Sequence, residues 1–328
     1  MIDLSSNENP YEPSQGIIEA VMRGSCSLNR YLRPSEIDAL KKALSNYNDV
    51  SSERIIVAHG TDCILRDIIL NFSKNRDLIT LNPSFPGLSE SAKYTAKRIL
   101  KIQLAPPEYT VDFDDAIQGP ALVIADYPNS PTGRCLIKRE QLIEVLKSSD
   151  NLVVIDEAYY EFSKKTFADL VDEYPNLAIS RTLDKAFSLA GLRVSYLIAG
   201  DSFLGRLSPY SQALGRPACL AAIAALEDKE YALGNVEKII DERERLRKGL
   251  EMAGLDVTPS ETNFLLVRTS IPEFASRLRK RNILIGDFSH TWLKNNYRIT
   301  VGTQKENDSL LNEIWSIHNS KEQYDEKM

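Results

Sequence analysis

The segment around which this chain is organised reads S-R-T-L-D-K-A-F-S-L-A-G-L-R-V-S-Y, residues 180–196. At its centre, Lys185 is flanked by small and apolar residues, with Thr182 three positions before it and Arg193 eight positions after it. Apolar surroundings disfavour the charged ammonium form, so such a lysine is more easily deprotonated and can attack an aldehyde. A hydroxyl group and an arginine on either side can bind a phosphate group. The segment therefore predicts a nucleophilic lysine beside an anion site.

Two apolar runs upstream end in polar residues. Residues 152–155 are followed by D-E-A-Y-Y, which places Asp156 at the end of a predicted buried strand. Residues 121–125 are followed by D-Y-P-N-S-P-T-G, a turn rich in Pro, Asn and Gly. In parallel α/β sheets, ligands bind in the crevice outside such strand ends. A carboxylate, a phenol, a lysine and an arginine that meet there provide what pyridoxal phosphate requires, which is an imine-forming lysine and an acidic partner for the ring nitrogen.

Several motifs follow one another in the order of a known family. They are N-E-N-P-Y at 7–11, N-R-Y at 29–31, P-N-S-P-T-G at 128–133, D-E-A-Y-Y-E-F at 156–162, the lysine segment, S-E-T-N-F at 260–264 and R-I-T-V-G-T at 298–303. On these residues the chain resembles fold-type I pyridoxal-phosphate-dependent aminotransferases and, within that group, is most similar to histidinol-phosphate aminotransferases. The resemblance implies a homodimer with a shared active site, which binds a small-molecule amino donor and a 2-oxo acid.

The expected fold is α/β, with a mostly parallel sheet in a large domain and a smaller α/β domain at the C-terminus. Short apolar runs that alternate with helical patterns predict the parallel sheet. We expect an N-terminal arm over 1–28, a large cofactor-binding domain with its linker helix over 29–228, and a small domain over 229–328. Within the large domain, Ser35 is expected to cap a helix, because apolar residues follow it at helical spacing.

The resemblance also implies residue roles. Lys185 is expected to bind the cofactor aldehyde and then to move a proton, Asp156 to keep the ring nitrogen protonated, and Tyr159 to donate a hydrogen bond to the ring's phenolic oxygen. The residues expected to bind the cofactor are Gly60, Thr61, Asp62, Phe85, Asn129, Ser130, Thr182, Arg193 and, from the partner subunit, Tyr31. The residues expected to bind the substrate are Arg298, Asn263 and Tyr11.

Three positions depart from the family pattern. Ser130 stands where an asparagine usually contacts the phenolic oxygen, so either Asn129 or Ser130 takes that role. Asp184 stands where a phosphate-binding serine usually precedes the lysine. A buried carboxylate facing a phosphate dianion is repulsive, so we expect Asp184 to turn toward solvent or toward an arginine such as Arg181. Gly286 stands where histidinol-phosphate aminotransferases commonly place an arginine for the substrate phosphate.

Arg216 is a candidate replacement for that missing cation, although we favour a structural ion pair for it. The chain also starts close to the N-E-N-P motif, without the family's longer N-terminal arm. The favoured activity is transfer of an amino group from histidinol phosphate to 2-oxoglutarate. The alternatives are an aminotransferase for another (aromatic) amino acid and a threonine-phosphate decarboxylase, which shares the fold and cofactor.

Composition is consistent with a cytoplasmic enzyme. The chain has 328 residues, of which 43% are hydrophobic, as is ordinary for a globular protein. Its net charge of −6 argues against a nucleic-acid-binding surface. The four cysteines are far apart and have no metal-ligand spacing, so we expect reduced cysteines and no metal. No run approaches the roughly 18 apolar residues of a membrane helix, and the first residues have no cationic start. We therefore expect neither a membrane nor a nucleic-acid partner.

Overall fold

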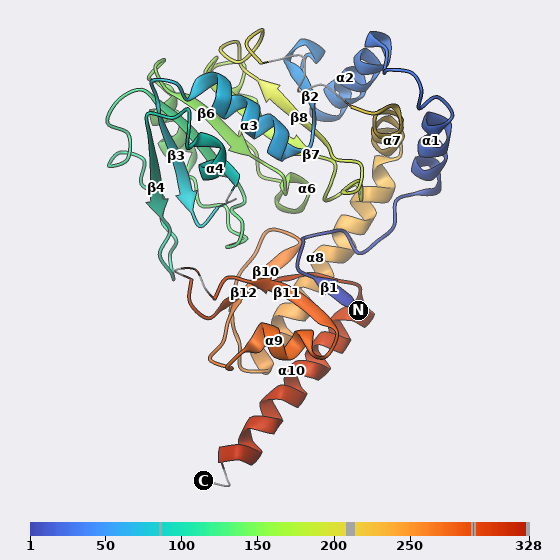
Figure 1. Cartoon of the computed structure of the whole chain (residues 1–328), viewed down its shortest axis with the longest axis vertical. Coiled ribbons are helices and arrows are strands. Elements are labelled where there is room, and N and C mark those ends of the chain that lie inside the picture. Colours follow the sequence, from blue (N-terminus) through green and yellow to red (C-terminus); the bar gives the residue numbers. More distant parts are fainter. Residues whose placement is uncertain (85–86, 208–213, 290, 292, 326–328) are drawn as a thin grey trace.

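The computed structural model describes residues 1–84, 87–207, 214–289, 291 and 293–325, and consists of two sheets with their helices (Figure 1). The 7-stranded sheet has the order β2-β8-β7-β6-β5-β3-β4, and the 5-stranded sheet has the order β1-β11-β12-β10-β9. The smaller sheet lies below the larger one in Figure 1. The α/β fold class and the two-sheet organisation agree with the sequence prediction.

The large sheet is mixed. The strands β3, β4, β5, β6 and β7 are mutually parallel, whereas β8 is antiparallel to both of its neighbours, β7 and β2. The strands are β2 (Ile55–His59), β3 (Asp77–Asn82), β4 (Arg98–Gln103), β5 (Ala121–Asp126), β6 (Leu152–Asp156), β7 (Leu177–Thr182) and β8 (Val194–Ala199). The inner strands are almost continuously buried because helices cover both faces of the sheet.

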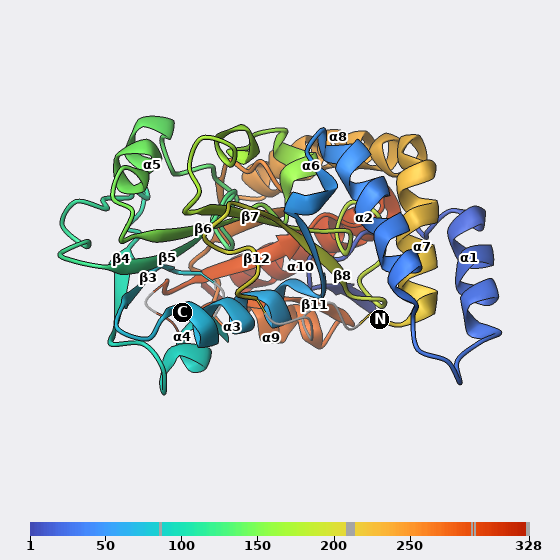
Figure 2. The ribbon, with the colours of Figure 1, turned by 90° about the horizontal axis from the view of Figure 1, so that it is seen from above.

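Helices α3 (Thr61–Phe72) and α4 (Gly87–Ala92) lie on one face, and α5 (Arg139–Leu146) and α6 (Tyr160–Ser163) lie on the other (Figure 2). Successive strand residues alternate between these faces. Along β6, for example, Val154 packs with the α3 side and Val153 with the α5 side. Each strand end is thereby fixed between two apolar layers, and this holds the polar residues that follow it in place.

The small sheet includes the very start of the chain. Its strands are β1 (Ile2–Leu4), β9 (Asp256–Thr258), β10 (Phe264–Arg268), β11 (Ile283–Asp287) and β12 (Asn296–Thr300). Strand β1 pairs in parallel with β11, and Leu4 is buried. The sequence interpretation assigned 1–28 to an N-terminal arm and missed β1, because three residues are too short to show a period.

The remaining helices connect and flank the two sheets. They are α1 (Gln15–Ser25), α2 (Pro34–Asn48), α7 (Arg216–Glu227), α8 (Lys229–Met252), α9 (Phe274–Arg279) and α10 (Gln304–Asp325). Helix α8 runs from α7 down to the small sheet (Figure 1). The prediction of a Ser35 cap is wrong: Arg33 is the cap residue, Pro34 opens the helix, and the Glu36 carboxylate accepts the Arg33 N–H at 2.9 Å. None of the described helices is long and apolar enough to cross a bilayer.

Candidate active site

A cavity of about 310 Å³ lies where the two sheets meet. The large sheet contributes the ends of β5, β6 and β7, the small sheet contributes residues of β12 and of the segment after β11, and the N-terminal segment contributes Ser6 and Asn7. Nine residues predicted for the site line it: Thr61, Asp62, Ser130, Asp156, Tyr159, Thr182, Lys185, Arg193 and Arg298. Residues separated by more than 200 positions in the sequence therefore share one cavity.

Lys185 follows the end of β7, and the N-terminal segment holds it from two directions. Its Nζ donates to the Ser6 carbonyl at 3.3 Å. The Asn9 side-chain amide donates to the backbone carbonyls of Lys185 at 3.2 Å and of Ala186 at 3.0 Å. Asn9 therefore fixes the backbone of the lysine segment, so the N-E-N-P motif contributes to the site although it lies at the opposite end of the chain.

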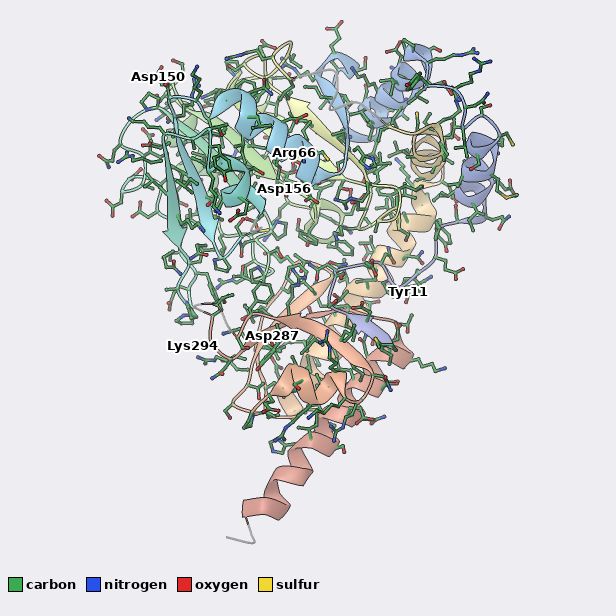
Figure 3. All side chains as sticks on the ribbon, in the orientation of Figure 1. Tyr11, Arg66, Asp150, Asp156, Asp287 and Lys294 are labelled. Atoms are coloured by element: carbon green, nitrogen blue, oxygen red, sulfur yellow. The ribbon has the colours of Figure 1, made fainter. Side chains whose placement is uncertain are left out.

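Asp156 ends β6 and lies at the edge of the large sheet that faces the small sheet (Figure 3). Its Oδ1 is buried and has no hydrogen-bond partner among the described residues. Burial, together with the neighbouring charges of Asp126 and Asp62, raises the pKa of Asp156 to about 8. A buried carboxylate oxygen without a donor, at the wall of a cavity that also holds Lys185, fits the protonated ring nitrogen of a pyridine.

Tyr159 lies three residues beyond Asp156 and is buried. Its hydroxyl accepts a hydrogen bond from the Asn7 side-chain amide at 2.8 Å, and its ring packs edge-on against Phe264 at 5.2 Å between centroids. The hydroxyl proton remains free to donate to a ligand in the cavity. Asn7, in turn, is fixed by the small sheet, because its backbone N–H donates to the Thr300 hydroxyl at 2.9 Å.

A candidate phosphate site lies at the start of helix α3. Gly60 caps this helix with φ +80°, and a Cβ on it would come within 2.9 Å of the Arg193 guanidinium. The Thr61 hydroxyl lies 3.1 Å from the Ser195 hydroxyl, on β8. Free backbone N–H groups and the helix dipole favour an anion at such an end. Gly60 itself does not line the cavity wall; its role is to let Arg193 approach the helix start.

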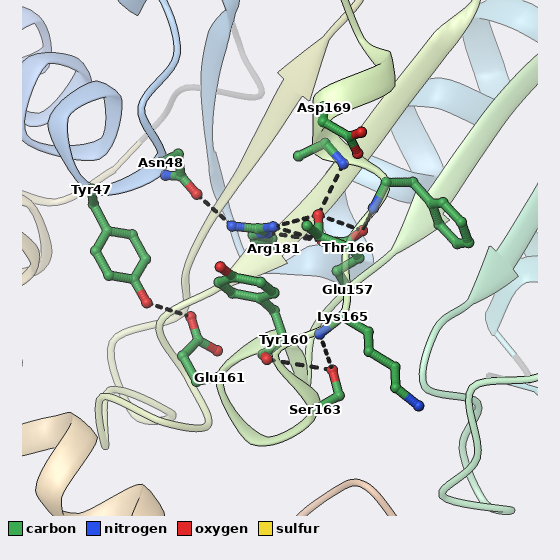
Figure 4. Close-up of polar contacts among 12 residues, drawn as sticks. Tyr47, Asn48, Glu157, Tyr160, Glu161, Ser163, Lys165, Thr166, Asp169 and Arg181 are labelled. Carbon is green, nitrogen blue, oxygen red and sulfur yellow. Dashed lines mark hydrogen bonds and ion pairs between the residues drawn. The ribbon is translucent and has the colours of Figure 1, made fainter. Parts of the chain in front are cut away.

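Asp184 turns toward an arginine, as predicted, but this arginine is not the one given as the example. Its side chain is buried and pairs with Arg193, not with solvent or with Arg181. Arg181 has a different partner, since its guanidinium binds the buried Glu157 carboxylate at 2.8 Å (Figure 4). Arg181 ends up near Glu157 because β6 and β7 are in register, which the sequence pattern does not reveal. Asp184 is instead anchored from its own segment, where its N–H donates to Thr182 Oγ1 at 3.0 Å.

The two alternatives at the P-N-S-P-T-G turn occupy different places. Asn129 is 0% exposed, and its amide donates to the Pro83 carbonyl at 3.0 Å and to Asp126 at 3.1 Å. These contacts are internal to the fold. Ser130 lines the cavity, and its hydroxyl accepts a hydrogen bond from Arg298 at 3.1 Å. Of the two residues, Ser130 is therefore the one placed to contact a ligand.

Arg298 lies on β12 and points into the cavity from the small sheet. Its guanidinium donates to the Ser5 carbonyl at 2.7 Å and lies 5.5 Å from the Phe264 ring and 5.6 Å from the Phe288 ring. Its buried Nε has no partner within the described part of the chain, and burial lowers the pKa of the guanidinium. These features suit a carboxylate ligand. Gly286 is the β-sheet partner of Arg298, so no side chain extends from that position.

Three other predicted residues, Asn263, Tyr11 and Tyr31, do not line the cavity. Asn263 is buried and donates to the Asn7 carbonyl at 3.0 Å, so it supports the segment that holds Tyr159. Tyr11 lies in the loop before α1 and outside the cavity wall. Tyr31 is 97% exposed. Phe85 lies outside the described residues.

The favoured interpretation of Arg216 agrees with the structure. Its guanidinium pairs with Glu36 at 2.7 Å and donates to the Tyr31 carbonyl at 2.8 Å. Arg216 therefore joins the start of α7 to the start of α2, and it does not line the cavity.

Asp126 is a site residue that the sequence interpretation treated only as part of a turn. It ends β5 in register with Asp156 on β6, and it lines the cavity. Its carboxylate accepts hydrogen bonds from the Ser84 hydroxyl and from the Ser130 N–H, both at 2.7 Å. Burial raises the pKa of Asp126 to about 6. The available signal was its position one residue beyond an apolar run that parallels the run before Asp156.

A mixed α/β sheet with a lysine, a carboxylate and an arginine around one cavity is the architecture of a fold-type I transferase. The sequence model of the family Aminotransferase class I and II matches residues 1–314, and the chain belongs to this family. The histidinol-phosphate aminotransferase of Sulfurisphaera tokodaii is 35% identical over 96% of this chain and 90% of that protein. That of Thermoanaerobacter pseudethanolicus is 36% identical over 94% of this chain and 91% of that protein.

The fold is also that of solved aminotransferase structures. The histidinol-phosphate aminotransferase of Sinorhizobium meliloti, solved in complex with pyridoxal-5'-phosphate, superposes with a TM-score of 0.85 at 23% identity. The superposition covers 97% of this chain and 91% of that one. At this level of identity, the likeness concerns the fold.

Proposed function

We propose that this protein is a pyridoxal-phosphate-dependent aminotransferase that transfers the amino group of histidinol phosphate to 2-oxoglutarate, a step of histidine biosynthesis. The observation that carries the proposal is the Asp156 Oδ1, which has no hydrogen-bond partner among the described residues and lies in the same cavity as Lys185 and Arg193. The donor is supported by relatives named histidinol-phosphate aminotransferase that match nearly the whole chain.

When bound, the cofactor supplies an aldehyde that condenses with amines and a ring that accepts electrons from the substrate carbon. Lys185 would hold the cofactor covalently, and its free amine would carry a proton to and from the reacting carbon. Asp156 would keep the ring nitrogen protonated through Oδ1, for which the described residues offer no partner. Tyr159 donates its hydroxyl proton to the phenolic oxygen, because Asn7 already occupies one of its lone pairs.

The cofactor phosphate would be held at the start of α3 by Thr61, Thr182 and Arg193 together with the backbone of Asp62. On the opposite wall, Arg298 binds the substrate carboxylate by a bidentate contact. Ser130 sits between these regions and, through its contact with Arg298, links the substrate side of the cavity to the cofactor side.

Gly286 favours a second candidate donor. No side chain extends from the position at which related enzymes bind the substrate phosphate, and the aromatic Phe288, two residues further along, lines the cavity. An unphosphorylated amino acid with an aromatic side chain fits an apolar wall of this kind. A threonine-phosphate decarboxylase has no such observation in its favour.

The test follows the absorbance of the bound cofactor after single additions of amino donors, in the absence of any 2-oxo acid. Among the donors, histidinol phosphate is expected to give the highest ratio of conversion rate to donor concentration when it converts the cofactor to its amine form. Addition of 2-oxoglutarate is then expected to restore the aldehyde form. Faster conversion by phenylalanine or tyrosine would establish the second candidate. Release of CO₂ from threonine phosphate, without any need for 2-oxoglutarate, would reject both.

We also propose a homodimer in which Tyr31 of one subunit reaches the phosphate site of the other. Tyr31 is almost fully exposed on the single chain and lies outside its own cavity, so a contact across an interface gives it a role. The cytoplasm is the proposed compartment, which agrees with four cysteines that are all free.

A further inference from the structure

Two carboxylates bind the one arginine of the phosphate site. Arg193 pairs with Asp184 through one terminal nitrogen and with Asp62 through the other, the latter at 3.0 Å. The backbone of Arg193 is left-handed, with φ +56°, which is uncommon outside glycine. The two ion pairs hold this arginine in its position against Gly60.

The surroundings of the two carboxylates differ. The Asp62 side chain is 56% exposed, so water solvates its charge, whereas the Asp184 side chain is 3% exposed. Oδ1 of Asp184 is buried, and the described residues offer it no hydrogen-bond donor. A buried carboxylate of this kind depends on its ion pair to remain charged.

The charges around Asp184 come from three elements. Arg193 faces it from the segment before β8, Lys185 follows it in its own segment, and Asp62 lies across the arginine on α3. Burial raises the pKa of Asp184, and Arg193 and Lys185 oppose that rise. A phosphate dianion that binds Arg193 adds negative charge at this point and competes for the same guanidinium. The ionised form of Asp184 then loses part of what stabilises it.

We propose that Asp184 is a positioning residue that holds Arg193 in place in the cofactor-free protein and takes up one proton from the solvent when the cofactor phosphate binds to that arginine. No other bond is made or broken in this step. The protonated carboxyl group can still accept a hydrogen bond from Arg193, so the arginine stays aligned while the repulsion disappears. The inference rests on the proposed function, since it requires a phosphorylated cofactor at this site.

The test is calorimetric titration of the cofactor-free full chain with pyridoxal 5'-phosphate at pH 8. Two buffers without primary amines, and with different heats of ionisation, give the number of protons taken up. The wild type is expected to take up about one proton more than Asp184→Asn, whose amide keeps a hydrogen bond to Arg193. In addition, the ratio of the wild-type Kd to the Kd of Asp184→Asn is expected to increase with pH, by up to roughly tenfold per pH unit.

Two controls separate this linkage from a structural effect. Pyridoxal, which lacks the phosphate group, is expected to give the same proton count with both proteins. Asp62→Asn removes the exposed partner of the same arginine and is expected to retain the wild-type proton count, because a solvated carboxylate stays ionised.

Equal proton counts for the wild type and Asp184→Asn would overturn the proposal. So would an Asp184→Asn protein that binds the cofactor more weakly at every pH with an unchanged pH dependence, since that pattern describes a structural role only. If neither protein bound pyridoxal 5'-phosphate at all, the proposed function would fail instead, so the two failures are distinguishable.

Discussion

Asp156 is placed where the fold is least favourable for its charge. Its Oδ1 is buried, the residue lies beside a second carboxylate, Asp126, and its pKa is raised to about 8. In the cofactor-free protein it therefore carries a proton at neutral pH, whereas the unfolded chain releases that proton near pH 4. Folding binds a proton over this interval, so stability falls as the pH rises from about 4 to about 8.

Asp156→Asn is therefore expected to stabilise the cofactor-free protein at alkaline pH. In the wild type, the free energy of unfolding falls by up to ~1.4 kcal/mol per pH unit as this group titrates, and the variant, which has no titrating group here, does not show this fall. The same variant is expected to lose most of its aminotransferase activity, because an amide does not keep the ring nitrogen protonated. Urea unfolding at pH 5 and pH 8 measures the first effect. A variant less stable than the wild type at pH 8 would show that the carboxyl group stabilises the fold.

At Arg298, the geometry of the side chain matters as much as its charge. Arg298→Lys keeps a cation but loses the planar fork and the contacts to Ser130 and Ser5. We expect kcat/KM for the amino donor to fall roughly 30-fold, about 2 kcal/mol, with unchanged affinity for the cofactor. Steady-state kinetics and cofactor titration measure the two quantities. An unchanged kcat/KM would remove Arg298 from the substrate site.

At the scale of elements, a buried ion pair joins the ends of β6 and β7. Arg181 binds Glu157, the Thr166 hydroxyl at 2.8 Å and the Asn48 side chain at 2.6 Å, and so connects both strands to the end of α2 (Figure 4). Because Asp156 immediately precedes Glu157 and Thr182 immediately follows Arg181, this pair fixes two strand ends that carry site residues.

Removal of one partner of this pair is expected to destabilise the protein strongly. Glu157→Gln leaves Arg181 buried without its counter-charge, at a cost of about 3–5 kcal/mol in the free energy of unfolding. Asp169→Asn, which breaks the exposed pair with Arg139, serves as the matched control and is expected to cost less than about 1 kcal/mol. Chemical unfolding checks both. If both variants lost the same free energy of unfolding, the buried pair would contribute no more to stability than the exposed pair.

The strands of the large sheet were predictable because their apolar runs are long and end in polar residues. The run before Asp156 and the run before Asp126 both proved to be inner parallel strands. Strand β1 was not predictable, since its three residues are ordered by pairing with β11, about 280 positions away. The domain boundaries at 28 and 228 remain predictions, although the β1 pairing joins the start of the chain to the small sheet.

The same distinction holds for the site. The position of Lys185, Asp156 and Arg193 around one cavity was predictable because the local sequence marks each of them. The partner of Asp184 was not, because Arg181 and Arg193 are both close in sequence and only the strand register decides between them. Likewise, the choice between Asn129 and Ser130 depends on which way each side chain points at the turn, and Asp126 directs that turn through the Ser130 N–H.

At the scale of the whole molecule, the proposed dimer predicts that defects in two subunits complement each other. Lys185→Ala removes the nucleophile, and Tyr31→Ala removes a phosphate ligand of the neighbouring site. A hybrid of the two variants has one site with both native residues, so we expect activity near half that of the wild type and above that of either variant alone. Co-expression with two affinity tags isolates the hybrid. A hybrid no more active than Tyr31→Ala would place Tyr31 outside the shared site.

The most direct measurement is the identity of the residue that binds the cofactor covalently. The purified protein is incubated with pyridoxal 5'-phosphate, reduced with borohydride and digested, and the modified peptide is located by mass spectrometry. We predict one cofactor per chain, on Lys185, and none in Lys185→Ala. Modification of a different lysine, or the absence of any stable adduct in the wild type, would contradict the assignment of this cavity as the catalytic centre.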